Sequence, residues 1–419
     1  MSKTSENDAN DELVPKPGSF VPANGLWWLH ESYSLTDGDV LLEGSSLLDL
    51  AALHGTPLYV YSTATIQRQL QRLGNALSSA AAAHRIFYAM KANRHPDILA
   101  AALKVAGVGL DTCSPREVQL ALACGCPREA ISFNAGMLSD RDLRYLAEQQ
   151  VHCTLDTFSA LRRYGRVAAP GTSIGLRFDP GVRASYGGDP RMSYGQAKFG
   201  FDPDQAAAAI AEAARVGLAV DTVHMHLGWG LPGESRGLMA AAFARLAAIA
   251  AAFPQVRAVN VGGGLGGRYV ESDRPILVPE WADIIATAFG PLGVEVCCEP
   301  GTFVAAPAGI LLVEVNTVER RRGHDWLGVD AGSAVNVNSA LYGIPLTALL
   351  LRAATAPPTH RYAIGGNINE AGDVWGYDVR LPEAREGDIL AFLPAGAYGA
   401  SMSSDHCLRG QAKQVVVSA

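Results

Sequence analysis

Polar residues recur where apolar runs end in the middle of this chain, and together they could carry out chemistry on a bound small molecule. They are an amine, carboxylates, an amide, a guanidinium, an imidazole and a glycine run, at Lys91, Asp111, Asn134, Asp156, Arg177, His226, 262–264 and Glu299. Any one of them alone could cap a helix or form an ion pair. Their shared placement indicates an enzyme, because a β/α barrel holds its chemistry at the carboxyl ends of its strands.

Lys91 ends the apolar run RIFYAMK. An amine held partly out of water in a pocket can form a Schiff base with a carbonyl compound. The alternative is a lysine that extends from a strand end into solvent.

Two glycine-containing segments could shape a ligand pocket. VGGGLGG (261–267) follows an apolar run, and glycines there would let backbone N–H groups approach a phosphate closely. Its spacing differs from the G-x-G-x-x-G of dinucleotide folds, and a flexible strand–helix turn is the alternative. Glu299-Pro300-Gly301 would hold a carboxylate toward a barrel mouth, or would form a surface turn.

His226 lies in HMHLGWG and shares one strand face with His224. Such a pair could ligate a metal, but no third ligand of matching spacing appears, so we expect no metal. Stacking of His226 on a planar ligand fits the position equally well. GAYGASMSSDH (396–406) is rich in hydrogen-bond donors and could contact a ligand or form a polar loop.

Eight apolar runs alternate with helical segments between residues 85 and 299. The runs are 85–91, 108–111, 131–134, 151–156, 173–178, 221–226, 257–263 and 293–299, and the helices include 96–106, 115–124, 139–149, 203–216 and 235–252. This alternation predicts an α/β fold with a parallel sheet, and eight units favour a closed (β/α)8 TIM-like barrel. An open doubly wound sheet would fit the same alternation.

Beyond residue 305 the sequence predicts strands without long helices between them, and Asp37-Gly38 predicts a hairpin near the N-terminus. We therefore expect a β domain built from both chain ends. The predicted organisation is a disordered tail over 1–22, a segment of the β domain over 23–57, the barrel over 58–304 and the C-terminal β domain over 305–419.

Composition narrows the classes of function. The formal net charge of the 419 residues is −7, and without a basic tract nucleic acid is an unlikely partner. The seven cysteines fit neither a zinc site nor a disulfide framework, which favours reduced thiols and a cytoplasmic protein. The N-terminus lacks the apolar core of a signal peptide. We expect no membrane span, because Arg245 interrupts the Ala-rich stretch 237–252.

In order along the chain, these segments resemble the fold-type III pyridoxal-phosphate decarboxylases, the diaminopimelate/ornithine decarboxylase family with an alanine racemase-like barrel. The resemblance covers nearly all of the chain after residue 25 and is strongest to diaminopimelate decarboxylase. Its best stretches are GTPLYVYS (55–62), FYAMKAN (87–93), KFGF (198–201), GGGLG (262–266), EPG (299–301), ALYG (340–343), EAGD (370–373), EGDIL (386–390) and GAYGASMSS (396–404).

The resemblance implies a role for each matching residue. Lys91 would bind pyridoxal 5'-phosphate covalently, His226 would stack on its ring, and Glu299 would pair with the ring nitrogen and keep it protonated. The phosphate would be held by Gly262, Gly263, Gly264, Gly301 and Tyr398, and we expect Asp111 and Arg177 to contact the cofactor as well. The family is a homodimer with shared sites, so residues 369–373 would reach the partner's site, with Glu370 in a catalytic role.

Departures from the family pattern suggest a different substrate. The usual cysteine before the EAGD segment is Asn369, and an amide cannot supply the proton that such a cysteine delivers. Where the resemblance implies two arginines that grip the substrate, this chain has Thr302 and Asn338. The family's tyrosine is retained as Tyr342. Where the resemblance implies a serine that contacts the phosphate, this chain has Trp229.

The substrate-binding set that we predict is therefore Thr302, Asn338, Tyr342, Glu370, Asp373 and Tyr398. The predicted function is decarboxylation of an amino-acid moiety in a larger conjugate, such as a siderophore or antibiotic intermediate or a carrier-bound aminoacyl group. His406 or Cys407 could supply the missing proton. Alternatives are a genuine diaminopimelate or other basic amino-acid decarboxylase, a transaminating or racemase-like enzyme on the same scaffold, and a non-catalytic regulator, which would be expected to lack Lys91.

Overall fold

The computed structural model describes residues 26–36, 38–81 and 83–418, which fall into two compact units. One unit holds the described residues up to Val60, together with Tyr269–Glu271 and Ile310–Val415. The other holds Tyr61–Arg268, Ser272–Gly309 and the residues from Val416 onward. The tail predicted over 1–22 lies outside the described residues, and the predicted limits 23–57, 58–304 and 305–419 stay predictions.

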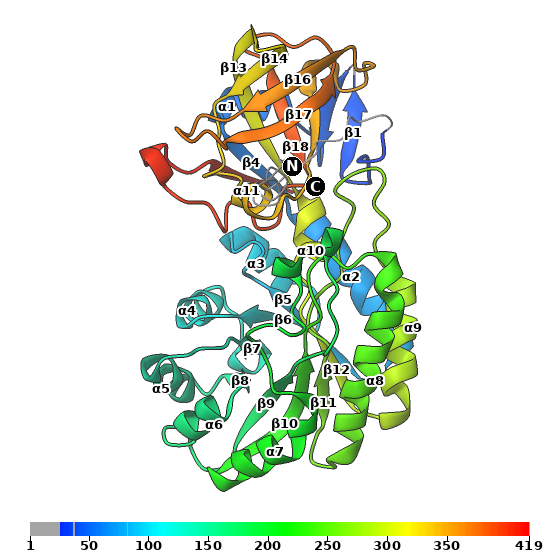
Figure 1. Cartoon of the computed structure of the whole chain (residues 1–419), viewed down its shortest axis with the longest axis vertical. Coiled ribbons are helices and arrows are strands. Elements are labelled where there is room, and N and C mark those ends of the chain that lie inside the picture. The colour runs from blue at the N-terminus through cyan, green and yellow to red at the C-terminus, as the bar shows by residue number, and fades with distance from the viewer. Residues whose placement is uncertain (1–25, 37, 82, 419) are drawn as a thin grey trace, which may run out of the picture. The chain divides into compact units, whose positions relative to one another are not determined.

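Eight parallel strands close into a barrel in the second unit (Figure 1). They are β5 (His84–Ala89), β6 (Val108–Thr112), β7 (Ile131–Asn134), β8 (His152–Leu155), β9 (Thr172–Phe178), β10 (Leu218–Met225), β11 (Ala258–Asn260) and β12 (Glu295–Cys298). The eight runs predicted from the sequence are these eight strands, and β12 pairs with β5 to complete the ring. The predicted barrel is confirmed, and the open sheet is excluded.

Helices alternate with the barrel strands. They are α2 (Thr63–Ala80), α3 (Pro96–Leu103), α4 (Pro115–Ala123), α5 (Asp140–Gln149), α6 (Phe158–Tyr164), α7 (Ala206–Arg215), α8 (Arg236–Ala252), α9 (Val278–Phe289) and the short α10 (Thr302–Ala305). Local sequence sets several starts. The hydroxyl of Ser114 accepts the N–H of Glu117 before α4, and Ser139 with Asp142 forms a capping box before α5.

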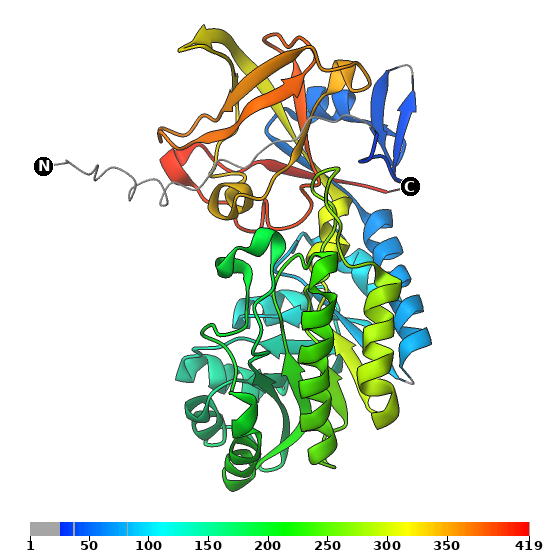
Figure 2. The same cartoon turned by 45° about the vertical axis from the view of Figure 1, so that its right-hand side comes forward.

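Helices α2, α9 and α8 pack side by side along the barrel, as the blue, yellow-green and green helices of Figure 2 show. The segment Gly233–Ala252 is long and apolar enough to cross a membrane by length and composition. In the structure one side of α8, including Met239, Phe243 and Leu246, is buried, and α8 contacts β10 and β11. The segment is therefore a helix of the barrel unit.

The other unit is built on strands. A three-stranded antiparallel sheet contains β1 (Tyr33–Thr36), β2 (Asp39–Leu42) and β3 (Ser45–Ser46), with Thr36 opposite Asp39 at the predicted hairpin. An eight-stranded sheet has the order β15 (Thr347–Leu350), β18 (Ile389–Leu393), β13 (Gly309–Arg321), β14 (His324–Val329), β16 (His360–Gly365) and β17 (Val374–Leu381); β4 (Leu58–Ser62) pairs with β13 and β19 (Lys413–Val417). Two helices, α1 (Leu47–His54) and α11 (Val337–Tyr342), complete this unit.

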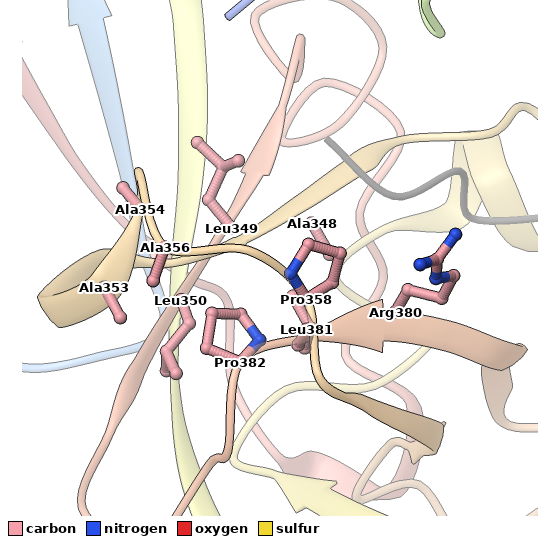
Figure 3. Close-up of a pocket in the computed structure, with 10 residues that line it drawn as sticks. All are labelled: Ala348, Leu349, Leu350, Ala353, Ala354, Ala356, Pro358, Arg380, Leu381 and Pro382. Atoms are coloured by element: carbon pink, nitrogen blue, oxygen red, sulfur yellow. The ribbon is translucent and has the colours of Figure 1, made fainter. Parts of the chain in front are cut away.

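A small apolar cavity lies beside the end of β15 in this unit (Figure 3). Alanines, leucines and prolines line it, among them Leu350, Ala356 and Pro382, and its volume is about 20 Å³. A space of this size holds about one water molecule, so it is a packing defect and not a ligand site.

A long loop between β9 and α7 is closed at its base by one carboxylate. The N–H of Gly181 donates to Asp179 Oδ1 at 2.6 Å, and the N–H of Gln196 donates to Oδ2 at 2.7 Å. Within the loop, the N–H of Tyr186 donates to the carbonyl of Trp229, whose own N–H donates to the carbonyl of Met192. The segment after β10 therefore holds the loop in place from within.

Candidate active site

Lys91 follows β5 and lies beside the end of the neighbouring strand β6. Its Nζ donates to Asp111 Oδ2 at 2.8 Å and lies 3.3 Å from Cys113 Sγ. Asp111 is fully buried, whereas the Lys91 side chain keeps about 38% of its surface exposed. The amine is therefore partly exposed and lies against a buried carboxylate, and its predicted bond to the cofactor stays a prediction.

Burial changes the acidity of both neighbours of Lys91. It raises the pKa of Asp111 to about 8, with a further increase from Glu299 and a partial decrease from the Lys91 charge. Burial also raises the pKa of the Cys113 thiol to about 12, and the Lys91 charge offsets part of this change. Cys113 is thus a neutral thiol at neutral pH.

Glu299 follows β12 and is held by polar side chains inside the barrel. Asn260 Nδ2 donates to its Oε1 at 2.8 Å, and His224 Nε2 lies 3.2 Å from its Oε2. Asn134 Nδ2 lies 2.9 Å from His224 Nε2 and 3.4 Å from Glu299 Oε2. Glu299 is 5% exposed, so these side chains replace water around its carboxylate.

This network keeps Glu299 ionised. Burial alone would raise its pKa, but His224 and the positive charge of Lys91 outweigh that effect and hold the pKa below the usual range of a glutamate. Burial lowers the pKa of His224, so this imidazole is neutral. A buried carboxylate with hydrogen-bond donors on both oxygens is suited to pair with a protonated ring nitrogen.

The glycines after β11 form a backbone cradle. Gly262 has φ +66°, and a Cβ there would lie 2.7 Å from the carbonyl oxygen of Met225. A Cβ at Gly263 would lie 2.6 Å from the carbonyl oxygen of Glu299. Only glycine fits at these two positions without a shift of the backbone. The close approach of these glycines to a phosphate stays a prediction.

His226 is fixed beside this cradle. Its Nδ1 accepts the N–H of Gly263 at 3.1 Å, and its ring lies 4.4 Å from the ring of Tyr194 at 42°. Burial and the positive charges of Arg177 and Lys91 hold the pKa of His226 well below its usual value, so the imidazole is neutral. A neutral imidazole is suited to stack on a planar ligand. Its predicted contact with the cofactor ring stays a prediction.

Arg177 ends β9 among aromatic rings. Its guanidinium lies 4.4 Å from the ring centre of Phe199 and 5.7 Å from that of Tyr194, and its Nη1 donates to Asn134 Oδ1 at 3.3 Å. Asn134 thereby joins Arg177 to the Glu299 network. His224 belongs to that network too, and the described residues contain no group of three or more His, Cys, Asp or Glu side chains suited to a metal.

The other predicted residues divide between the two units. Gly301 and Thr302 follow Glu299 in the barrel unit, where Thr302 begins α10 and is 3% exposed. Asn338, Tyr342, Asn369, Glu370, Asp373 and Tyr398 belong to the unit of strands. Asn338 is buried in α11, and Tyr398 has a left-handed φ of +59°.

Asp373 proves to be a structural carboxylate of its own loop. Its oxygens accept the N–H groups of Ser333 and Ile368 at 2.7 and 2.8 Å and the indole N–H of Trp375 at 3.3 Å. These hydrogen bonds fix its loop, and its predicted contact with a substrate stays a prediction. Glu370 is exposed and lies 3.2 Å from His406 Nε2, which joins two of the residues predicted to act in catalysis or proton transfer.

The barrel unit fits a phosphorylated pyridine aldehyde. Four polar atoms near Lys91 and Glu299 are buried without a hydrogen-bond partner among the described residues: Asp111 Oδ1, Asp156 Oδ2, Arg177 Nη2 and His224 Nδ1. Buried polar atoms in native proteins are normally satisfied, so these atoms indicate a polar ligand. An amine, an ionised buried carboxylate and a glycine cradle are the donor set that pyridoxal phosphate requires.

Comparison with known proteins identifies the class. The family of pyridoxal-dependent decarboxylases, represented by its pyridoxal binding domain, matches residues 63–306. The chain belongs to this family: it is a pyridoxal-phosphate-dependent amino-acid decarboxylase, a carboxy-lyase, with the barrel and β-sheet units of the fold-type III enzymes.

Several relatives over nearly the full chain are diaminopimelate decarboxylases. The chain is 30% identical over 392 residues to a diaminopimelate decarboxylase of Methanothermobacter thermautotrophicus, covering 91% of each chain. It is 33% identical over 398 residues to one of Pseudomonas aeruginosa, covering 92% of this chain and 94% of the relative. The solved diaminopimelate decarboxylase of M. jannaschii in complex with L-lysine has a TM-score of 0.84 at 25% identity, with 93% of each chain covered.

Sequence reasoning missed three contacts of the site. Asn260 lies in the run RAVNVGG, where its position two residues before Gly262 was the available signal. Cys113 follows Asp111 at the spacing that places both side chains on one strand face. Tyr194 gave no signal, because its contact with His226 depends on the course of a loop.

Proposed function

We propose that this decarboxylase acts on an amino-acid moiety other than free diaminopimelate, as part of a larger conjugate of the kind found in siderophore or antibiotic intermediates or on carriers. The observation that supports this proposal is the identity of Thr302. It is 3% exposed and directly follows the Glu299-Pro300-Gly301 segment, where the family resemblance implies an arginine.

Asn338 supports the same proposal from the other unit. It is 7% exposed and stands where the resemblance implies the second substrate-gripping arginine. A guanidinium binds a carboxylate through two parallel hydrogen bonds, which neither threonine nor asparagine can reproduce. Replacement of both removes charge and bulk, so the second carboxylate of diaminopimelate would lose its recognition.

The chain's own residues divide the work of the reaction. Lys91 would hold the cofactor covalently, and Asp111 would fix the Lys91 nitrogen in place. When bound, pyridoxal phosphate supplies an electron sink for the pair released as CO2 leaves. Glu299 would keep a positive charge at the ring nitrogen, the glycines at 262–264 would hold the phosphate, and His226 would cover the ring.

A second candidate is diaminopimelate itself or another basic amino acid. The names of the relatives in M. thermautotrophicus and P. aeruginosa favour it, as does the L-lysine bound to the M. jannaschii and Helicobacter pylori enzymes. Relatives at about 30% identity often share chemistry, so this candidate is tested beside the first.

The experiment is CO2 release by the purified holoenzyme from meso-diaminopimelate, L-lysine, L-ornithine and amide-linked conjugates of diamino acids. We expect turnover of a conjugate and turnover of meso-diaminopimelate that is slower by at least about a hundredfold, as expected for loss of two charged contacts. Brisk turnover of meso-diaminopimelate would reject the conjugate and establish the second candidate.

We further propose that reprotonation after CO2 loss uses a group other than the family's cysteine, because Asn369 stands in its place. His406 and Cys407 are the candidates, and the contact of His406 with Glu370 at 3.2 Å supports the first. If the proton is delivered to the cofactor carbon, part of the cofactor would be converted to pyridoxamine phosphate, as in a transaminating enzyme. Mass spectrometry after turnover tests this: no pyridoxamine form in wild type, H406A or C407A would reject it.

The assembly and location of the enzyme complete the proposal. We infer a cytoplasmic homodimer with shared sites, in which Glu370 of one subunit serves the other. Mixing H406A subunits with K91A subunits provides the test. Activity near a quarter of wild type in the mixture, with none in either parent, supports shared sites.

A further inference from the structure

The amino-terminal end of the barrel contains a second cavity, at the opposite ends of the strands from Lys91 and Glu299. Its volume is about 310 Å³, and residues of β5, β7, β8, β10, β11 and β12 line it. This size is within the range of small-molecule sites, about 300–1,000 Å³. The proposed decarboxylation does not use this end of the barrel.

Charged side chains of both signs surround the cavity. Four of them form two pairs: Arg85 Nη2 lies 3.2 Å from Glu295 Oε1, and His152 Nε2 lies 2.9 Å from Asp221 Oδ1. Each of these four residues lines the cavity. The charges of Arg85 and Glu295 offset each other, and Asp221 also accepts hydrogen bonds from Ser173 and Thr222.

Two charges remain outside these pairs. Arg257 and Glu129 also line the cavity, and the side chain of neither makes a hydrogen bond or an ion pair within the described ranges of the chain. Arg257 immediately precedes β11, and Glu129 lies in the turn before β7. Three strands separate β11 from β7 in either direction around the ring, so the cation and the anion lie on opposite sides of the cavity.

Part of the surface between these charges is apolar, beside polar residues such as Ser132 and Thr154. Phe87, Ala258 and Cys297 form a buried cluster, and all three belong to the lining. An aliphatic chain of a few carbons would be removed from water there, at about 0.8 kcal/mol per methylene. From one side to the other, the cavity thus presents a cation (Arg257), an apolar surface and an anion (Glu129).

We propose that this cavity binds a small linear zwitterion, with a carboxylate at one end and an ammonium group at the other. Arg257 would bind the carboxylate and Glu129 the ammonium, with the chain on Phe87. A simple anion would leave Glu129 facing an apolar chain end, and a simple cation would leave Arg257 unmatched. The charge arrangement therefore selects a ligand that carries both signs.

Asn260 connects this cavity to the active site. It lines the cavity and also donates the 2.8 Å hydrogen bond to Glu299 Oε1. A ligand in the cavity would lie one side chain away from the carboxylate that is proposed to hold the cofactor ring. The inference itself rests on Arg257 and Glu129 and is independent of the substrate.

The test is isothermal titration of the holoenzyme with 4-aminobutanoate and 6-aminohexanoate, with hexanoate and hexylamine as probes of a single charge. We expect one zwitterion site per chain, with both single-charge probes weaker by at least about tenfold. No saturable binding of either zwitterion at millimolar concentration would overturn the proposal.

Variants locate the binding. R257Q and E129Q should each weaken the zwitterion by at least about tenfold. The matched control is R128Q, because Arg128 adjoins Glu129 but bonds to Gln149 and does not line the cavity. The double reversal R257E/E129R should restore binding that each single reversal abolishes. Wild-type affinity in R257Q and E129Q would place the ligand elsewhere and reject the inference.

Discussion

Lys91 Nζ lies 2.8 Å from Asp111 Oδ2, and the two residues come from the ends of adjacent strands, β5 and β6. K91A removes the amine that this arrangement offers for covalent attachment of the cofactor. We expect loss of the visible absorbance band of the lysine-bound cofactor and at least about a thousandfold lower kcat. The control is K104A, an exposed lysine after α3. A retained band in K91A would contradict the assignment.

Glu299 is expected to act through its charge. E299Q keeps the shape of the side chain and its contact with Asn260 but removes the negative charge beside the ring nitrogen. We expect kcat to fall by about a hundredfold or more while KM changes little, because the charge matters most as CO2 departs. E212Q, on α7 at the surface, is the control. Equal effects of both variants on kcat would remove Glu299 from the mechanism.

Asp111 should make the stability of the cofactor-free protein depend on pH. Its pKa is raised from 3.8 to about 8 in the folded protein, so the folded state keeps a proton that the unfolded chain loses. Stability should therefore fall as pH rises from about 4 to about 8, by up to about 1.4 kcal/mol per pH unit from this group. D111N lacks this titration.

The measurement for Asp111 is urea unfolding of wild type and D111N at several pH values. The free energy of unfolding of wild type minus that of D111N should decrease steadily across the window and level off above it. A difference that is constant, or that increases with pH, would show that folding does not raise the pKa of Asp111.

Gly263 should be intolerant of a side chain. In G263A the new Cβ would meet the carbonyl oxygen of Glu299 at 2.6 Å, and this clash would shift the cradle. We expect the affinity for pyridoxal phosphate to fall by at least about tenfold. Gly267 is the matched control, because a Cβ there has no atom within 4 Å. Titration of cofactor fluorescence measures both variants, and equal affinities would exclude a tight cradle.

The barrel was predictable because its signals are local. Runs such as SIGLRF and DTVHMH are short and apolar, and the Ala/Leu-rich stretches between them have the length of helices. Strand ends could be named from the same runs, which located Lys91, Glu299 and His226. The strands β15 and β17 were not predicted, since TALL and VWGYDVRL lie among turn-forming residues without a clear period.

The partners of these strand-end residues could not be predicted. Asn134 meets Glu299 only because β7 and β12 come together around a closed ring, and their separation in sequence is 165 residues. The structural role of Asp373 was equally hidden, because a carboxylate in EAGD resembles a ligand-binding acid until its backbone donors are known. Register across the barrel and the course of loops decide these contacts, and neither has a local signature.

The paired hydrogen bonds of Asp179 have a consequence for how this enzyme can diversify. The Asp179 side chain joins Gly181 to Gln196, so the two ends of this loop are held at a fixed distance from each other. We expect insertions near 187–189 to leave β9 and α7 in their positions. Evolution could thus change the substrate through substitutions in this loop, with little effect on the stability of the barrel.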